Sequence, residues 1–216
     1  MNRHSQSVAQ FFDGFASTYD RAIRAISYFM PDFLNTRLSQ LDVAPRVILD
    51  AACGTGLAGK ILKQRFPSAT LYGCDISAKM LAQAAQKGVY DQLQVGNLDD
   101  PLDQYSDGQF DLVVCLGAVE FLESPEQAMS ELFRVLRAGG VACVSFQEFA
   151  ENDAGKPRRT QANEQVQGCA YSIAESTSML EHCGFAIHEV DSETAYVSSG
   201  GFACPYAVYT VMRPRS

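Results

Sequence analysis

The sequence of 216 residues lacks any apolar run approaching the roughly 18 residues needed to span a bilayer. Its opening stretch, MNRHSQSVAQFF, also lacks the apolar core of a secretory signal peptide. These two absences argue against a membrane partner and against export. We therefore expect a cytoplasmic protein.

Basic residues are few, with 17 Lys and Arg against 25 Asp and Glu and a formal net charge of −8. A surface of this sign repels a polyanion, so nucleic acid is not an expected partner. The seven cysteines include no C-x-x-C pair. We interpret them as small buried side chains in a reducing compartment rather than as a disulfide framework or a zinc site. Four of them lie in or beside predicted buried strands, namely Cys53, Cys74, Cys115 and Cys143.

What is present, from Arg46 onward, is an alternation of short apolar runs with helical patterns. We expect strands at RVILDA, ATLYGC, QLQVG, FDLVVCL and VACVSF, and helices over 56–66, 77–87 and 124–137. A polar stretch over 151–168 predicts a loop, and after it we expect a helix over 172–183 and strands near 185–192 and 205–212. Alternation of this kind predicts an α/β fold, doubly wound around a parallel sheet.

The length favours one domain, which we divide into three parts. Residues 1–45 form an N-terminal helical lid, in which 5–40 are expected to be two helices broken near Pro31. Residues 46–146 form the cofactor-binding core. Residues 147–216 contribute a substrate-side loop, a helix and the final two strands.

The stretch LDAACGTGLAG places Gly54, Gly56 and Gly59 in the G-x-G-x-x-G pattern of a dinucleotide-binding turn. Asp50 closes the preceding strand, and its carboxylate would repel a pyrophosphate at this helix N-terminus. A ligand with a cationic group and no phosphate is favoured instead, and S-adenosylmethionine is such a ligand. Asp75, at the end of the next strand, is at the distance where an acid accepts hydrogen bonds from both ribose hydroxyls. A helix N-cap is the other interpretation of Asp75, and the two roles are compatible.

These motifs resemble those of the class I S-adenosylmethionine-dependent methyltransferases. VILDAACGTG is similar to their first motif, GCDIS to the acidic end of their second strand, and VGNLDD to the segment after the third. The upstream FFDGFASTYD resembles the helix before the core in the ubiquinone and menaquinone C-methyltransferases and the malonyl carrier-protein methyltransferases. The resemblance implies a Rossmann-like, seven-stranded, mostly parallel sheet of order 3-2-1-4-5-7-6 with the last strand antiparallel.

The resemblance also implies roles for individual residues toward S-adenosyl-L-methionine. Those expected to contact the methionine end, ribose, adenine and methyl group are Tyr19, Asp50, Ala52, Gly54, Gly56, Asp75, Ile76, Met80, Asn97, Leu98, Leu116 and Gly117. Plain core packing is the alternative for the apolar members of this set. Asn97 departs from the family, which commonly has Asp there, although its amide still matches an adenine edge.

The methyl acceptor is expected to meet 118–123, 147–171 and 195–207, beyond the carboxyl ends of the strands. Glu120 is a candidate base or cation-binding group there, with a solvated loop acid as its alternative. Tyr19 is the second candidate catalytic residue, carried on a segment whose Phe11, Phe12 and Phe15 cover one helix face, and the alternative is three core aromatics and a surface tyrosine. Lys156, Arg158 and Arg159 either recognise a carboxylate or phosphate or form a solvated charge run.

The sequence thus predicts a methyltransferase that acts on a small molecule by in-line transfer, with no metal and with the acceptor atom open among O, N, C and S. Methyl transfer needs alignment and water exclusion more than a catalytic base. Three alternatives are a nucleotide-dependent oxidoreductase, a cofactor-binding protein without turnover, and an enzyme that uses the sulfonium to assist a rearrangement. The oxidoreductase is opposed by Asp50 and by the lack of any Tyr-x-x-x-Lys.

Overall fold

A computed structural model describes residues 1–149, 159–161, 166–197 and 203–215. The chain forms one seven-stranded sheet of order β3-β2-β1-β4-β5-β9-β8. Its strands are β1 (Val47–Ala51), β2 (Thr70–Asp75), β3 (Gln92–Val95), β4 (Phe110–Cys115), β5 (Leu136–Gln147), β8 (Ala186–Val197) and β9 (Ala203–Met212). The first five pair in parallel, and β9 runs antiparallel to both β5 and β8.

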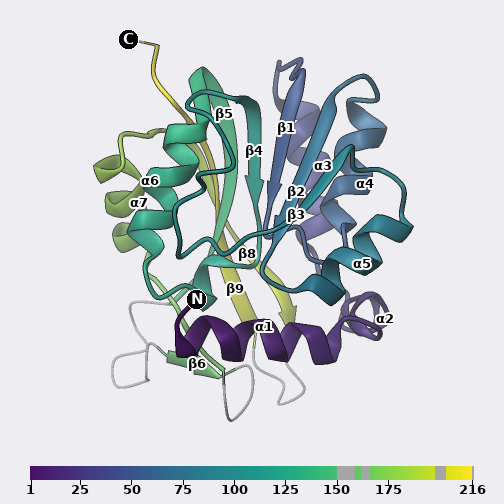
Figure 1. Ribbon diagram of the computed structural model, residues 1–216. Coiled ribbons are helices and arrows are strands. Elements are labelled where there is room, and N and C mark those ends of the chain that lie inside the picture. Colours follow the sequence, from purple (N-terminus) through teal and green to yellow (C-terminus); the bar gives the residue numbers. More distant parts are fainter. Residues whose placement is uncertain (150–158, 162–165, 198–202, 216) are drawn as a thin grey trace.

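Helices cover both faces and one end of this sheet (Figure 1). They are α1 (Arg3–Phe15), α2 (Tyr19–Ala25), α3 (Met30–Gln40), α4 (Leu57–Arg65), α5 (Ala78–Gln86), α6 (Pro125–Val135) and α7 (Ile173–His182), with a single 3-10 turn, η1 (Val119–Phe121). Helix α1 lies across the end of the sheet to which the parallel strands point (Figure 1).

Two apolar cores, one on each face, hold the layers together. On one face Met129 and Leu132 of α6 and Leu180 of α7 are fully buried against the sheet. On the other face Leu38 of α3 and Leu62 of α4 are buried against β1, β2, β4 and β5. The near-continuous burial of the central strands is what a parallel sheet covered on both faces requires.

Local sequence signals fix where the helices begin. The Ser77 hydroxyl accepts a hydrogen bond from the Met80 amide and so caps α5. Ser172 and Glu175 form a reciprocal capping box at the start of α7. Such caps satisfy backbone donors that the first helical turn leaves unpaired.

The predicted fold class is confirmed. The predicted strand order 3-2-1-4-5-7-6 is also confirmed, since β8 is the sixth and β9 the seventh strand when only the strands of the large sheet are numbered. Two short strands, β6 (Arg159–Gln161) and β7 (Gln167–Cys169), pair outside it. They replace part of the loop expected over 151–168, most of which lies outside the described residues. The final two strands are longer than predicted because they pair with each other over their full length.

The expectation of two N-terminal helices is wrong, because the segment forms three. The unpredicted break lies at 16–18, between α1 and α2, whereas the break expected near Pro31 corresponds to the junction of α2 and α3, where Ser27 has a left-handed φ of 51°. Pro31 stands inside the first turn of α3, where a missing amide proton costs no helical hydrogen bond. Among the described residues, no helix has both the length and the apolar character needed to cross a membrane.

Candidate functional site

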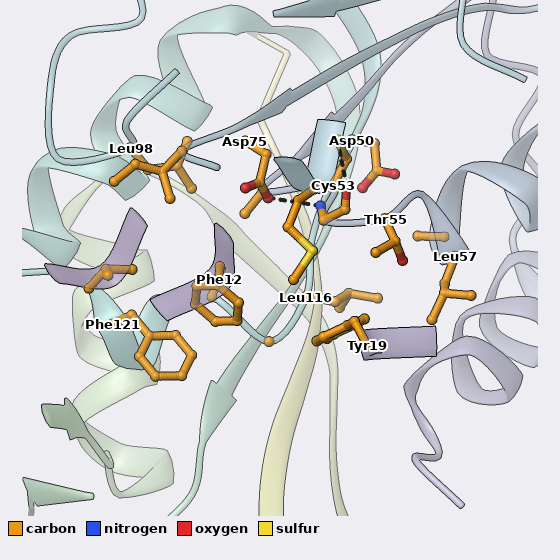
Figure 2. Close-up of a pocket in the computed structure, with 18 of the residues that line it drawn as sticks. Phe12, Tyr19, Asp50, Cys53, Thr55, Leu57, Asp75, Leu98, Leu116 and Phe121 are labelled. Carbon is orange, nitrogen blue, oxygen red and sulfur yellow. Dashed lines mark hydrogen bonds between the residues drawn. The ribbon is translucent and has the colours of Figure 1, made fainter. Parts of the chain in front are cut away.

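A pocket lies at the carboxyl ends of β1, β2 and β4, beneath α1 and beside α2 (Figure 2). It gathers every residue predicted to contact the cofactor except Gly56. These lining residues are Tyr19, Asp50, Ala52, Gly54, Asp75, Ile76, Met80, Asn97, Leu98, Leu116 and Gly117. Residues far apart in the sequence therefore meet at one edge of the sheet, where ligands of open α/β sheets bind.

The turn after β1 is held in left-handed backbone conformations, with φ of 55° at Ala52, 53° at Gly54 and 85° at Gly56. Glycine adopts such angles without steric cost, whereas alanine does so with strain. A Cβ added at Gly54 would meet no atom within 4 Å, so this glycine faces open space. The turn therefore offers bare backbone to a ligand at Gly54.

The other two glycines of the pattern make room for Tyr90, a residue that the sequence analysis did not single out. A Cβ at Gly59 would fall 2.3 Å from both Cζ and the hydroxyl oxygen of Tyr90, and one at Gly56 would fall 2.8 Å from its ring. The Tyr90 hydroxyl donates a hydrogen bond of 2.6 Å to a carboxyl oxygen of Asp50. The only signal for this contact was the small size of the residues in the turn.

Asp50 is nearly inaccessible, with 2% of its surface exposed, although it borders the pocket. Burial raises the pKa of its carboxyl to about 7, and the hydrogen bond from Tyr90 opposes that rise. A cation placed beside Asp50 would favour its charged form. The side chain is therefore suited to a positively charged ligand group rather than to a pyrophosphate.

Asp75 lies on the opposite side of the turn from Asp50, with Cys53 between them (Figure 2). One carboxyl oxygen accepts from the Gly54 amide and the other from the Ser77 amide, each at 2.8 Å. The alternative interpretation of Asp75 as an N-cap is wrong, since Ser77 caps α5. Burial raises the pKa of Asp75, and the two amide bonds oppose that effect.

One end of the pocket is apolar, lined by Ile76, Met80 and Leu98. Asn97 borders it as predicted, but its amide nitrogen donates to Ser5 Oγ at 3.3 Å and to Asp100 at 3.1 Å. Its amide oxygen accepts from the Asp99 backbone at 3.2 Å. The Asn97 side chain thus has protein partners on both of its polar atoms, including one on α1.

Glu120 is buried in η1 with only 3% of its surface exposed, so its interpretation as a solvated loop acid is wrong. The Tyr206 hydroxyl donates to Glu120 Oε1 at 2.5 Å, whereas Oε2 has no partner among the described residues. Burial raises the pKa of Glu120 to about 7. Glu120 does not itself line the pocket, but its neighbours Ala118 and Phe121 do.

The pocket wall next to Glu120 is built from Tyr19, Tyr28 and Gly117. A Cβ at Gly117 would fall 2.6 Å from the Tyr28 hydroxyl, so the glycine allows this ring to approach the end of β4. The Glu120 charge contributes to raising the pKa of both Tyr19 and Tyr28, after burial. Both tyrosines therefore stay neutral and lie within electrostatic range of Glu120.

Polar contacts dock the first two helices onto the loops that follow the strands. From α1, Asp13 accepts from the Ser77 hydroxyl at 2.6 Å, and from α2, Asp20 accepts from Thr55 at 2.5 Å and from Lys87 at 2.9 Å. Phe12 lines the pocket and packs edge-to-face on Phe121, with ring centroids 5.4 Å apart (Figure 2). The N-terminal segment thus forms one wall of the pocket.

Several other predicted residues lie elsewhere. Lys156 and Arg158 lie outside the described residues, and Arg159 is described only as part of β6. Cys53, Cys74, Cys115 and Cys143 are buried, as expected. Within the described ranges, no cluster of His, Cys, Asp and Glu has an arrangement that could hold a metal ion.

Comparison with known proteins supports a relationship to methyltransferases. Residues 49–144 match the methyltransferase domain family. The chain is 28% identical over 201 residues to malonyl-[acyl-carrier protein] O-methyltransferase from Laribacter hongkongensis, covering 84% of this chain and 64% of that protein. It is 40% identical over 102 residues to demethylmenaquinone methyltransferase from Thermus thermophilus, covering 46% of each. The chain thus spans about half to two thirds of the length of these relatives.

Solved structures share the whole fold. The structure described as the [4+2]-cyclase SpnF superposes with a TM-score of 0.77 at 17% identity, covering 98% of this chain and 97% of that one. The Rossmann-like architecture and the matched core, with the glycine turn and two acids around one pocket, agree with the family pattern. The family match, the curated relatives and the shared fold together support a class I S-adenosylmethionine-dependent methyltransferase.

Proposed function

We propose that this protein binds S-adenosylmethionine in the pocket and transfers its methyl group to a small molecule. The observation that carries the proposal is the pairing of open backbone at Gly54 with the buried acids Asp50 and Asp75. No lysine, arginine or histidine is among the described residues that line the pocket. This combination of acids, open backbone and no basic side chain fits a ligand with cationic groups and a ribose, and it disfavours phosphates.

Different residues of the pocket would contact different parts of S-adenosylmethionine. Asp75 would accept from the ribose hydroxyls, Met80 and Leu98 would enclose the adenine, and Asp50 would face the cationic methionine end. When bound, S-adenosylmethionine supplies an electrophilic methyl group. The chain's own contribution is to align the acceptor and to exclude water, which is the main need of a reaction whose electrophile is already activated.

We infer that the lid, residues 1–45, supplies much of that exclusion. Helix α1 lies across the carboxyl ends of the strands, and Tyr19 at the start of α2 borders the pocket (Figure 2). The Tyr19 hydroxyl would contact either the cofactor or the acceptor. Glu120, with a pKa of about 7, is suited to take a proton near neutral pH.

Calorimetry with S-adenosylmethionine, its demethylated product and NAD tests the cofactor assignment. We expect the first two to bind and NAD to give no heat. Asp75→Ala should weaken cofactor binding by about 2–4 kcal/mol, since hydrogen bonds to charged groups contribute about 1.5–3 kcal/mol each. Asp103→Ala, which changes an exposed acid, is the matched control. Tight binding of NAD alone, or unchanged affinity in a folded Asp75 variant, would contradict the assignment.

The reaction itself is tested by incubating the protein with cell extract and a donor carrying an isotopically labelled methyl group. A product heavier by one labelled methyl group supports methyl transfer. A rearranged product of unchanged mass would support a sulfonium-assisted reaction instead. Cofactor binding without any product would support a binding protein without turnover.

A further inference from the structure

Charge in the described pocket has one sign. Its ionisable lining side chains, apart from two tyrosines and the Cys53 thiol, whose pKa is raised by burial, are the acids Asp50, Asp75 and Asp99. Glu120 adds a fourth acid just behind the wall that Tyr19 and Tyr28 form. An acceptor that carries a carboxylate or phosphate would meet only negative charge from these residues, because like charges repel strongly where water is excluded. The described pocket therefore favours a neutral or cationic acceptor.

Glu120 favours a cationic acceptor over a neutral one. It is 97% buried, one of its oxygens accepts from Tyr206, and the other oxygen has no partner among the described residues. Buried polar atoms are nearly always hydrogen-bonded, so an orphaned carboxyl oxygen beside a ligand pocket calls for a donor from the ligand. A donor that also carries positive charge would offset the burial of the carboxylate, whereas a neutral hydroxyl would not.

Aromatic rings enclose Glu120 from several elements. Tyr206 comes from β9, Tyr196 from β8, and Tyr28 from the junction of α2 and α3, where the Tyr28 and Tyr196 ring centroids are 6.1 Å apart. The Phe29 amide donates to the Ala195 carbonyl at 2.9 Å and so fixes this junction against β8. Faces of aromatic rings attract ammonium groups, and a carboxylate within the same enclosure strengthens that preference.

We propose that the methyl acceptor is a small primary or secondary amine, whose ammonium group is recognised by Glu120 within the enclosure of Tyr28, Tyr196 and Tyr206. This inference rests on the proposed methyl transfer and names its substrate class. It also gives Glu120 a catalytic part, since an ammonium nitrogen has no lone pair until a base removes a proton.

The proton and the electrons balance as follows. The ammonium gives one proton to the Glu120 carboxylate, which frees the nitrogen lone pair. That pair forms the bond to the methyl carbon, and the carbon–sulfur bond of the donor breaks with its electrons remaining on sulfur. The products are an N-methylated ammonium, the neutral thioether and a protonated Glu120, which returns its proton to solvent.

The groups around Glu120 keep their charge state while it titrates. The ionisable side chains that interact with it are Tyr19, Tyr28, Tyr171, Tyr196, Tyr206 and Cys115. Burial raises the pKa of each, so all six remain neutral near pH 7. Asp50, which borders the pocket, also has its pKa raised to about 7, so only the part of an activity change near that pH that is lost in Glu120→Gln reports on Glu120.

Three probes of matched size test the substrate class: 2-phenylethylamine, 2-phenylethanol and 3-phenylpropionic acid. Each is titrated by calorimetry into the protein saturated with the demethylated cofactor, and each is incubated with labelled donor. We expect the amine to bind at least tenfold more tightly than the other two and to be the probe that is methylated. Glu120→Gln should raise the KM for the amine by about 30-fold or more, as expected on removing one partner of a buried charge pair. It should also reduce the rise of kcat/KM with pH near 7, leaving only the part that depends on Asp50.

Glu126→Gln, which changes an exposed acid on α6, is the matched control and should alter neither quantity. The affinity of Glu120→Gln for S-adenosylmethionine should match that of the unaltered protein, which shows that the variant is folded. Tighter binding of the alcohol or the acid, binding of none of the probes, or an unchanged KM in Glu120→Gln would overturn the amine proposal. Failure to bind S-adenosylmethionine would instead overturn the proposed function, so the two failures are distinguishable.

Discussion

Replacing Gly59 by Ala in α4 should have two opposing effects on the stability of the folded protein. Alanine is favoured over glycine in a helix interior by about 1 kcal/mol, so propensity alone predicts a more stable protein. At Gly59, however, the new Cβ would lie 2.3 Å from Cζ and the hydroxyl oxygen of Tyr90, well inside van der Waals contact. The ring must move away, and overpacking of this kind costs about 1–3 kcal/mol.

Movement of Tyr90 also removes its 2.6 Å hydrogen bond to Asp50, a residue with 2% of its surface exposed. Leaving a buried polar group unsatisfied costs about 1–3 kcal/mol more. Set against the gain in propensity, we expect Gly59→Ala to lower the free energy of unfolding by about 2–4 kcal/mol. Cofactor affinity should fall with it, because Asp50 borders the pocket.

Urea denaturation followed by circular dichroism measures the effect. Gly14→Ala in α1 is the matched control, since a Cβ there would meet nothing within 4 Å and should leave stability unchanged or slightly higher. In a Tyr90→Leu background the cost of Gly59→Ala should shrink, giving a coupling energy in the double-mutant cycle. The reasoning is refuted if Gly59→Ala proves as stable as Gly14→Ala, or if its cost is the same in both backgrounds.

Three further predictions concern the same region. Ala52→Gly should raise the free energy of unfolding by about 1 kcal/mol in urea denaturation, because Ala52 has a φ of 55° that glycine adopts without strain; lower stability would contradict this. Since burial raises the pKa of Asp50 and Glu120 to about 7, both bind protons more tightly when folded, so the stability that these two groups contribute should be fully present below about pH 4 and decline toward pH 7 by up to about 1.4 kcal/mol per pH unit for each group. The decline of stability with rising pH should be smaller in Glu120→Gln, and an identical slope in that variant would contradict the prediction. Deletion of residues 1–20 should leave a folded domain by circular dichroism but raise the KM for the donor and largely abolish methyl transfer, whereas full activity would mean that this segment only packs.

Much of the fold could be predicted because its signals are local. The apolar runs of β1, β2, β4 and β5 are long enough and regularly enough spaced to identify a covered parallel sheet. The glycine turn and Asp75 were identified from spacing along the chain, and the structure brings them to one pocket. Helix α6 was predicted from its amphipathic pattern and is confirmed as Pro125–Val135.

What the sequence missed depends on contacts between distant residues. The role of Tyr90 depends on three-dimensional room left by Gly56 and Gly59, which no local pattern indicates. Glu120 stands in the apolar stretch LGAVEFL after β4, and its hydrogen-bond partner Tyr206 lies 86 positions later in the chain. The break between α1 and α2 falls at residues 16–18, which contain neither glycine nor proline, so these two helices looked like one.

The position of β9 in the sheet has a consequence for how the protein is made. This strand inserts between β5 and β8, although it follows both in the sequence. A growing chain that has released residues up to Gln147 can already pair β1 through β5 and form the glycine turn. Tyr206, which is the hydrogen-bond partner of Glu120, emerges from the ribosome some 60 residues later. The proposed S-adenosylmethionine site would therefore form earlier in synthesis than the proposed acceptor site, so a nascent chain that does not yet include Tyr206 would hold the donor before it could use it.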